Sequence, residues 1–163
     1  MTKTEAIVLH SFKYGEQRLI VDMFTREHGR LAFIVPIPLS GRAKLKKQYF
    51  QPLTLLYIET DLRQQAQLQK LREAGLLVPL PSLQMEPTKM AIALFVAECL
   101  YHALKGEQRD TALFDFLRSS IEWLDARQAH YANFHLVFLM HLTRFLGFYP
   151  NLQGDGSESC FDL

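Results

Sequence analysis

The hydrophobic pattern of this chain changes its period once, at the segment 78–82, which reads VPLPS. Before this segment, short β-prone runs alternate with turn residues, a pattern that is typical of strands. After it, apolar residues recur every three to four positions, as they do along amphipathic helices. The two prolines interrupt both patterns and mark a boundary. The sequence therefore predicts an α+β protein, with a strand-built domain over residues 1–80 and an all-α domain over residues 83–163.

Five strands are expected in the first domain, over residues 4–12, 18–25, 31–35, 50–59 and 66–71. Gly15 and Gly29 fall in the tight turns between the first three strands, because glycine tolerates the positive φ of such turns. Five short strands within about seventy residues are typical of a small closed barrel, most often an OB-fold. An SH3-like barrel fits the same pattern.

Three helices are expected in the second domain. The first spans residues 87–105, with Pro87 in the first turn and Gly106 just after the end. Its run from Met90 to Leu104 is apolar nearly all round, which predicts a buried central helix. The second helix follows a cap at Asp110. The third spans residues 129–146.

Positive charge is concentrated in the first half of the chain. Residues 1–81 hold twelve Lys and Arg against seven Asp and Glu, whereas residues 82–163 hold six against ten. The densest run is the segment 42–47, RAKLKK, between two hydrophobic segments. A strand-anchored loop of this kind can neutralise nucleic-acid phosphates, and neighbouring aromatic residues can stack on bases. These aromatic candidates are Tyr14, Phe33, Tyr49 and Phe50. A solvated loop above core aromatics is the alternative.

The cysteine content, the length of the charge-free stretches and the first residues of the sequence indicate where in the cell the protein is expected. Only Cys99 and Cys160 are present, so no disulfide framework is indicated and a reducing compartment is expected. The longest stretch without a charged residue, 128–143, is shorter than the ~20 residues of a membrane span. The first residues lack the pattern of a signal peptide. We expect a soluble, cytoplasmic protein without membrane contact.

Catalytic and metal sites are weakly indicated. Cys99 and His102 have the spacing of a ligand pair on one helix, but a structural zinc site uses four ligands, and a buried core cysteine is the favoured interpretation. The segment 154–159, GDGSES, does not match the nucleophile elbow of hydrolases. No phosphate-binding glycine loop is present. We therefore predict that the protein is not an enzyme and uses no cofactor or metal.

The helical domain is rich in aromatic residues, which suggests either a groove for an apolar peptide end or a simple core. The core is the favoured interpretation, because aromatic stripes at helical spacing usually face inward. The residues concerned are Phe95, Phe114, Phe116, Trp123, Phe134, Phe138 and Phe145.

Four segments taken together resemble the RecO family of bacterial recombination mediators. They are the opening run 4–31, the basic segment, the strand QPLTLLYIE at 51–59 and the LGFYP at 146–150. The resemblance covers nearly the whole chain in the same order. It implies an N-terminal OB-fold followed by a helical domain. Members of the family usually continue well beyond this length, and many carry a four-cysteine zinc module that is not matched here. We expect a zinc-less, C-terminally truncated member.

The resemblance also implies the function. Proteins of this family bind and anneal single- and double-stranded DNA, and they work with RecR to load the RecA recombinase onto DNA coated by single-strand-binding protein (SSB), whose C-terminal tail docks on the helical domain. Barrel cations and two tyrosines are the expected DNA-binding residues: Lys13, Tyr14, Arg18, Arg30, Arg42, Lys44, Lys46, Lys47 and Tyr49. The alternative is an adaptor whose barrel and helices bind acidic peptides or partner subunits without touching DNA.

Overall fold

The computed structural model describes residues 1–37, 45–106 and 108–147. Five strands close into a barrel in the order β1-β2-β3-β5-β4, with β3 and β5 parallel and the other pairs antiparallel. This connectivity confirms the five-stranded OB-fold. The strands are β1 (Thr2–Tyr14), β2 (Arg18–Thr25), β3 (Gly29–Pro36), β4 (Leu55–Asp61) and β5 (Leu68–Leu76).

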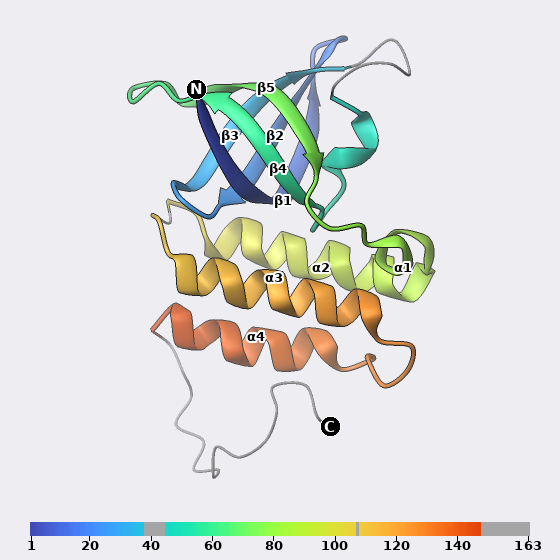
Figure 1. Cartoon of the computed structure of the whole chain (residues 1–163). Coiled ribbons are helices and arrows are strands. Elements are labelled where there is room, and N and C mark those ends of the chain that lie inside the picture. The colour runs from blue at the N-terminus through green and yellow to red at the C-terminus, as the bar shows by residue number, and fades with distance from the viewer. Residues whose placement is uncertain (38–44, 107, 148–163) are drawn as a thin grey trace.

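The helical part follows the barrel directly. It consists of α1 (Pro81–Met85), α2 (Pro87–Ala103), α3 (Thr111–Ala126) and α4 (Phe134–Phe145). Figure 1 shows the barrel seated on α2 and α3, with α4 on the far side of the stack. The side chain of Asp110 accepts a hydrogen bond from the Leu113 amide, so the expected N-cap of α3 is present.

The fourth strand begins later than expected. Residues 50–54 do not pair as a strand, because the 3₁₀-helix η1 (Lys47–Phe50) and a turn precede β4. In that turn Leu53 adopts a φ of 62°, and its amide donates a hydrogen bond of 2.8 Å to the Val8 carbonyl. The buried Leu53 side chain keeps this left-handed backbone in place, because its packing in the core offsets the strain.

Other boundaries also differ from the expectation. β5 starts two residues later and runs five residues further than the predicted 66–71. The short helix α1, which was not predicted, begins at Pro81 inside the predicted boundary segment 78–82. The last helix begins at Phe134 and not at 129. These shifts arise because pairing partners and packing, rather than local propensity, set where an element ends.

Helix α2 is buried along one face only, which corrects the prediction of a helix buried all round. Ile92, Val96 and Leu100 are buried, whereas Leu94 and Phe95 are exposed. The barrel and the neighbouring helices cover one side of α2, and its apolar outer residues remain in contact with solvent. Composition cannot distinguish such a half-covered helix from a central one, because both are apolar around the axis.

One hydrophobic cluster joins the base of the barrel to the helices. Phe24 of β2 stacks on Phe114 of α3, with ring centroids 6.3 Å apart, and Leu53 belongs to the same cluster. Across the surface of this junction, Arg118 contacts Glu5 at 3.1 Å. The second cluster fills the barrel itself. The helices are therefore held against the barrel by shared buried surface and not only by the connecting chain.

Candidate nucleic-acid interface

An aromatic row runs along the outer face of β1. His10, Phe12 and Tyr14 alternate with residues that face the other side, because successive side chains of a strand point in opposite directions. Phe12 is 43% exposed and Tyr14 is 55% exposed. The ring of His10 lies 5.9 Å from Phe12 and 4.6 Å from Tyr101 of α2. The row therefore leads from the helices toward the far end of the barrel.

The strands next to β1 continue this surface. Tyr14 lies opposite Arg18 of β2, and Phe12 lies opposite Ile20, which in turn lies opposite Ile34 of β3. Lys70 of β5 is paired with Ile34 and is exposed. We call the outer residues of β1, β2 and β3, namely Phe12, Tyr14, Arg18, Ile20 and Ile34, the β1–β3 face. It combines apolar and aromatic side chains with cations at its edges.

A second group of cations is positioned by η1. Lys46 and Lys47 are exposed at the start of this turn, while Phe50 at its end is buried in the barrel. The Ser11 hydroxyl donates a hydrogen bond of 2.9 Å to the Phe50 carbonyl and ties η1 to β1. A hollow beside η1, called the η1 hollow, is lined by Ser11, Leu19, Lys47, Gln48, Phe50, Gln51 and Pro52.

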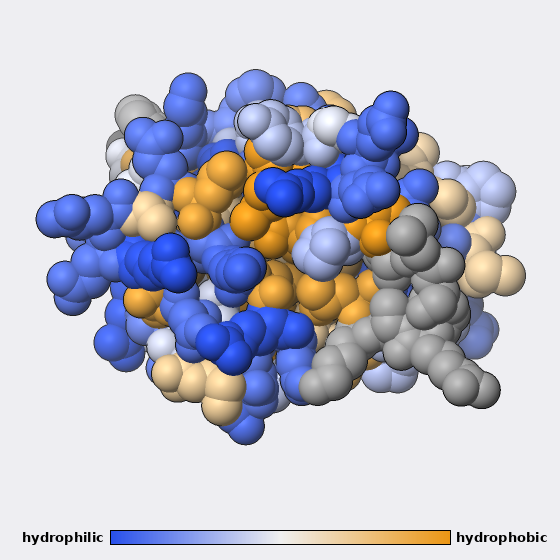
Figure 2. Space-filling view, turned by 90° about the horizontal axis from the view of Figure 1, so that it is seen from above, coloured by the Kyte–Doolittle hydropathy of each residue, from blue (hydrophilic) through white to orange (hydrophobic). Residues whose placement is uncertain are grey.

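The η1 hollow is lined on one side by Lys47 and on the other by Ser11 and Leu19 of the β1–β2 pair. Leu19, which lines it together with Lys47, lies opposite Lys13 and directly follows Arg18. Figure 2 looks down on the end of the barrel that faces away from the helices, where apolar side chains are framed by hydrophilic ones. An apolar centre with a polar and cationic rim is what a strand of unpaired bases requires.

Arg30 lies at the other end of the barrel. Its guanidinium is 4.6 Å from the centre of the Tyr101 ring, donates a hydrogen bond to the Tyr101 carbonyl and contacts Asp22 at 3.5 Å. Only 11% of its side chain is exposed. Arg30 therefore links the barrel to α2 and does not belong to the β1–β3 face.

The remaining predicted residues divide into three groups. Arg42 and Lys44 lie outside the residues that the structure describes. Tyr49 is half-buried against the barrel core, and the Lys46 ammonium lies 5.9 Å from its ring centre. Phe33 and Phe50, suggested as stacking residues, are 0% and 2% exposed and belong to the core. Of the four aromatic candidates, Tyr14 is the one whose ring is exposed.

The sequence reasoning does not single out Phe12, Ile20 and Ile34 of the β1–β3 face, or the neighbouring Lys70. Phe12 is predicted only as the end of the first strand, although its i, i+2 spacing from Tyr14 places both rings on one face. That spacing is a usable signal. No local sequence signal marks Lys70, because its position beside β3 depends on the parallel β3–β5 pairing between segments far apart in sequence.

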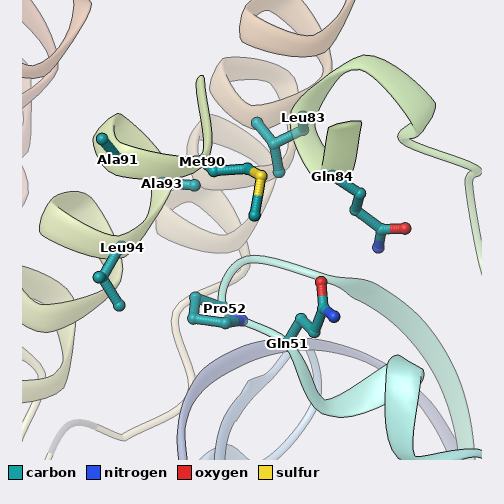
Figure 3. Close-up of a pocket in the computed structure, with 8 residues that line it drawn as sticks. All are labelled: Gln51, Pro52, Leu83, Gln84, Met90, Ala91, Ala93 and Leu94. Atoms are coloured by element: carbon teal, nitrogen blue, oxygen red, sulfur yellow. The ribbon is translucent and has the colours of Figure 1, made fainter. Parts of the chain in front are cut away.

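A pocket of about 290 Å³ lies between the barrel and the helices (Figure 3). Pro52 from the barrel side and Met90 and Leu94 from α2 supply apolar walls. Gln51 and Gln84 extend toward each other across the opening, from the turn after η1 and from α1. Gln51 and Pro52 also line the η1 hollow, so the two cavities adjoin.

The candidate metal pair does not form a site in this structure. His102 contacts Glu98 at 3.1 Å, and Cys99 is half-buried, with its pKa raised chiefly by burial. Within residues 1–37, 45–106 and 108–147, no three His, Cys, Asp or Glu side chains are grouped to hold a metal ion. No helix in these ranges is long and apolar enough to span a membrane.

The aromatic residues of the helical part mainly pack between helices. Phe116 stacks on Phe138 and Phe145, with ring centroids 5.5 Å and 5.0 Å apart, and Trp123 stacks on Phe134 at 5.7 Å. The core interpretation therefore describes most of these rings. Phe95 is an exception, since 47% of its surface is exposed.

Comparison with known proteins gives a consistent result. A family model described as "Recombination protein O N terminal" matches residues 1–79, and one described as "Recombination protein O C terminal" matches residues 84–160. The chain is 45% identical over 163 residues to DNA repair protein RecO of Bacteroides fragilis, covering all of this chain and 67% of that protein.

Two further relatives carry the same name. The protein of Phocaeicola vulgatus is 44% identical over 161 residues, covering 99% of this chain and 66% of the relative. That of Flavobacterium psychrophilum is 37% identical over 152 residues, covering 93% and 63%. The chain thus spans about two thirds of the length of these relatives.

Proposed function

Because this chain belongs to the RecO family, whose members are named as DNA repair proteins, we propose that it binds DNA in recombinational repair. The binding surface is the β1–β3 face together with the cations beside η1. One observation carries this proposal: on an OB-fold barrel, Arg18 lies opposite the exposed ring of Tyr14, and Lys13 lies opposite Leu19, which lines the η1 hollow together with Lys47. The strand face and adjoining loops of this fold commonly bind oligonucleotides.

The chemistry of binding divides between the two kinds of side chain. Lys and Arg neutralise phosphates and release counterions, which makes binding independent of sequence and sensitive to salt. Phe12 and Tyr14 offer π-faces on which unpaired bases stack, at about 1–3 kcal/mol per base. Duplex DNA engages only the cations, because its bases are already stacked on each other. Single strands should therefore be bound more tightly than duplexes of equal charge.

Strand annealing follows from such binding without nucleotide hydrolysis. Two strands held on the surface of one protein have a raised effective concentration, and partial neutralisation lowers their mutual repulsion. We propose that this activity, with RecR as partner, helps load the RecA recombinase onto DNA coated by SSB, as the family resemblance implies.

Fluorescence anisotropy of labelled single-stranded DNA across a salt series tests the DNA interface. The test variant replaces four cations by alanine: Lys13, Arg18, Lys46 and Lys47. We expect weaker binding of every sequence and a shallower salt dependence. The log–log slope should fall by about 0.7 for each phosphate that the variant no longer neutralises.

A control variant removes the same charge from cations elsewhere on the surface: Lys3, Lys105, Arg109 and Arg127. These positions lie on the first half of β1, after α2 and at the two ends of α3. The control should bind DNA nearly as the unmodified chain does. Equal weakening in both variants would show that net charge, and not the β1–β3 face, governs binding.

A protein-binding role is the second candidate. Exposed apolar side chains on the helical part favour it, because such residues commonly mark interaction surfaces when they cluster. They include Leu94 and Phe95 of α2 and Leu136 and Met140 of α4. The acidic C-terminal tail of SSB is the partner that the family resemblance implies. Competition distinguishes the two roles: a tail peptide that displaces DNA shares its site, and one that binds alongside DNA uses the helices.

A further inference from the structure

The pocket between the barrel and α2 has a mixed lining that barrel–helix packing does not require. Its walls are apolar, with Pro52 on one side and Met90 and Leu94 on the other. At its opening stand the side-chain amides of Gln51 and Gln84. Among the described residues, neither amide makes a hydrogen bond to another protein group. Both amides are therefore available to a ligand.

A nucleobase matches this lining. Its flat faces are apolar and its edge carries hydrogen-bond donors and acceptors, so it fits between Pro52 and Met90 while an amide meets the edge. A glutamine amide presents both donors and an acceptor, the combination that reads base edges. The volume of about 290 Å³ is at the lower limit for small-molecule pockets, and suits one ring system. An aliphatic side chain would leave both amides unused.

The position of the pocket points to DNA as the source of that base. Gln51 and Pro52 separate it from the η1 hollow, where Lys47 is exposed. A phosphate held by Lys47 would therefore place the next nucleotide of the strand beside the pocket opening. The cation beside an apolar cavity complements a nucleotide, which has a negative backbone and an uncharged base.

We propose that this pocket receives one unstacked base of a single strand whose backbone is held at Lys47. The inference rests on the DNA-binding function proposed above and assigns it a defined base subsite. Holding one base out of the stack at this point would set the register of the strand on the protein. The base is gripped from the barrel side by Pro52 and from α2 by Met90 and Leu94.

The test separates base binding from backbone binding. Thymidine oligonucleotides of about 15 nucleotides, the upper range for one OB-fold, are compared with oligonucleotides of equal length in which abasic sites replace alternate bases. A third set carries a single 2-aminopurine, which brightens when it leaves the stack. The full chain should bind abasic strands about fivefold to tenfold more weakly, as expected when one well-held base is removed, and should brighten 2-aminopurine.

Filling the pocket provides the matched variant. Ala91 is exposed on α2 and lines the pocket, so Ala91→Trp blocks it without disturbing the core. Ala112→Trp places the same side chain at an exposed position on α3. We expect Ala91→Trp to lose the part of the preference for intact strands that the pocket supplies, to keep the part that stacking on Phe12 and Tyr14 supplies, and to reduce the 2-aminopurine signal. Ala112→Trp should behave as the unmodified chain, and Gln84→Leu should weaken the preference.

The outcomes are distinguishable. Salt-dependent binding in which Ala91→Trp keeps the whole preference for intact over abasic strands would overturn the base subsite and leave the DNA-binding function standing. Absence of binding to any strand would overturn both. An apolar-ended peptide that binds the full chain but not Ala91→Trp, with no abasic preference, would assign the pocket to a protein partner and overturn the base subsite.

Discussion

The guanidinium of Arg30 lies over the ring of Tyr101, 4.6 Å from its centre, and so connects β3 to α2. The same guanidinium contacts Asp22 at 3.5 Å. Arg30 is thus a cation of the barrel whose guanidinium is occupied by contacts within the protein. It lies at one end of the barrel, and Arg18 lies at the other end, beside the β1–β2 turn. Two arginines with the same sequence rationale therefore have different surroundings, since Arg30 contacts Tyr101 and Asp22 whereas Arg18 is exposed opposite Tyr14.

Arg30→Ala should reduce stability and leave DNA affinity close to that of the unmodified chain. The decrease should be about 1–3 kcal/mol, since a partly desolvated cation–π interaction and charge-assisted hydrogen bonds disappear together. Urea unfolding and anisotropy measured on the same preparations check this. Arg18→Ala is the matched control, with the opposite pattern expected. A large decrease in the DNA affinity of folded Arg30→Ala would show that Arg30 contributes to DNA binding.

Phe12→Ala and Tyr14→Ala should each weaken binding of single strands more than binding of duplexes. Only unpaired bases can stack on these exposed rings, at about 1–3 kcal/mol per base. Competition titrations with the two forms of DNA at one salt concentration measure the difference. Tyr57→Ala on β4, a similarly exposed position outside the β1–β3 face, is the control. A uniform decrease for both DNA forms would argue against stacking.

Lys89→Met should destabilise the chain by about 2–5 kcal/mol, because it removes the donor at the centre of a buried hydrogen-bond network. The Lys89 ammonium is buried and donates hydrogen bonds to the Ser82 hydroxyl at 2.7 Å and to the carbonyls of Asp125 and Arg127. Methionine fills the volume but leaves these acceptors without a donor.

Thermal or urea unfolding measures the effect of Lys89→Met, and Lys105→Met, at an exposed position just past α2, serves as control. A change in the free energy of unfolding of less than about 0.5 kcal/mol is within the range of ordinary surface substitutions. It would mean that water or a rearranged side chain replaces the hydrogen bonds that the two carbonyls have lost.

Stability should fall as the pH is lowered from about 6.5, in part through His141. Burial, and then the charge of Arg144, lower the pKa of His141 below its ordinary value of 6.5. As the pH falls, His141 therefore binds a proton at a higher pH in the unfolded chain than in the folded chain. Stability is retained above the pKa that His141 has in the unfolded chain and is lost below it. His141→Gln should lose less stability between about pH 7.5 and pH 5.5 than the unmodified chain. Unfolding midpoints at both pH values test this, with exposed His28→Gln as control.

Local sequence pattern was sufficient for the order and type of most elements. Alternation marked β2, the Asp110 cap marked the start of α3, and the change of period at residues 78–82 separated strands from helices. Tyr14, Lys13, Arg18 and Lys47 are candidates for the DNA interface because charged and aromatic residues cluster in the chain itself. Patterns of this kind depend on residues within a few positions of each other, and these are visible in a single sequence.

Interactions between segments that are far apart in the chain are not visible in the sequence. Leu53 turns the chain at positive φ because Val8 and the core hold it, and Phe50 is buried because it packs in the barrel core at the end of η1. Arg30 is engaged because Tyr101, 71 residues later, lies beneath it. The pocket between Gln51 and Gln84 exists because α1 packs beside the turn before β4. The type of a residue and its neighbours in sequence determine its chemistry. Whether it is available to a ligand depends on whether a side chain from a distant part of the chain already contacts it.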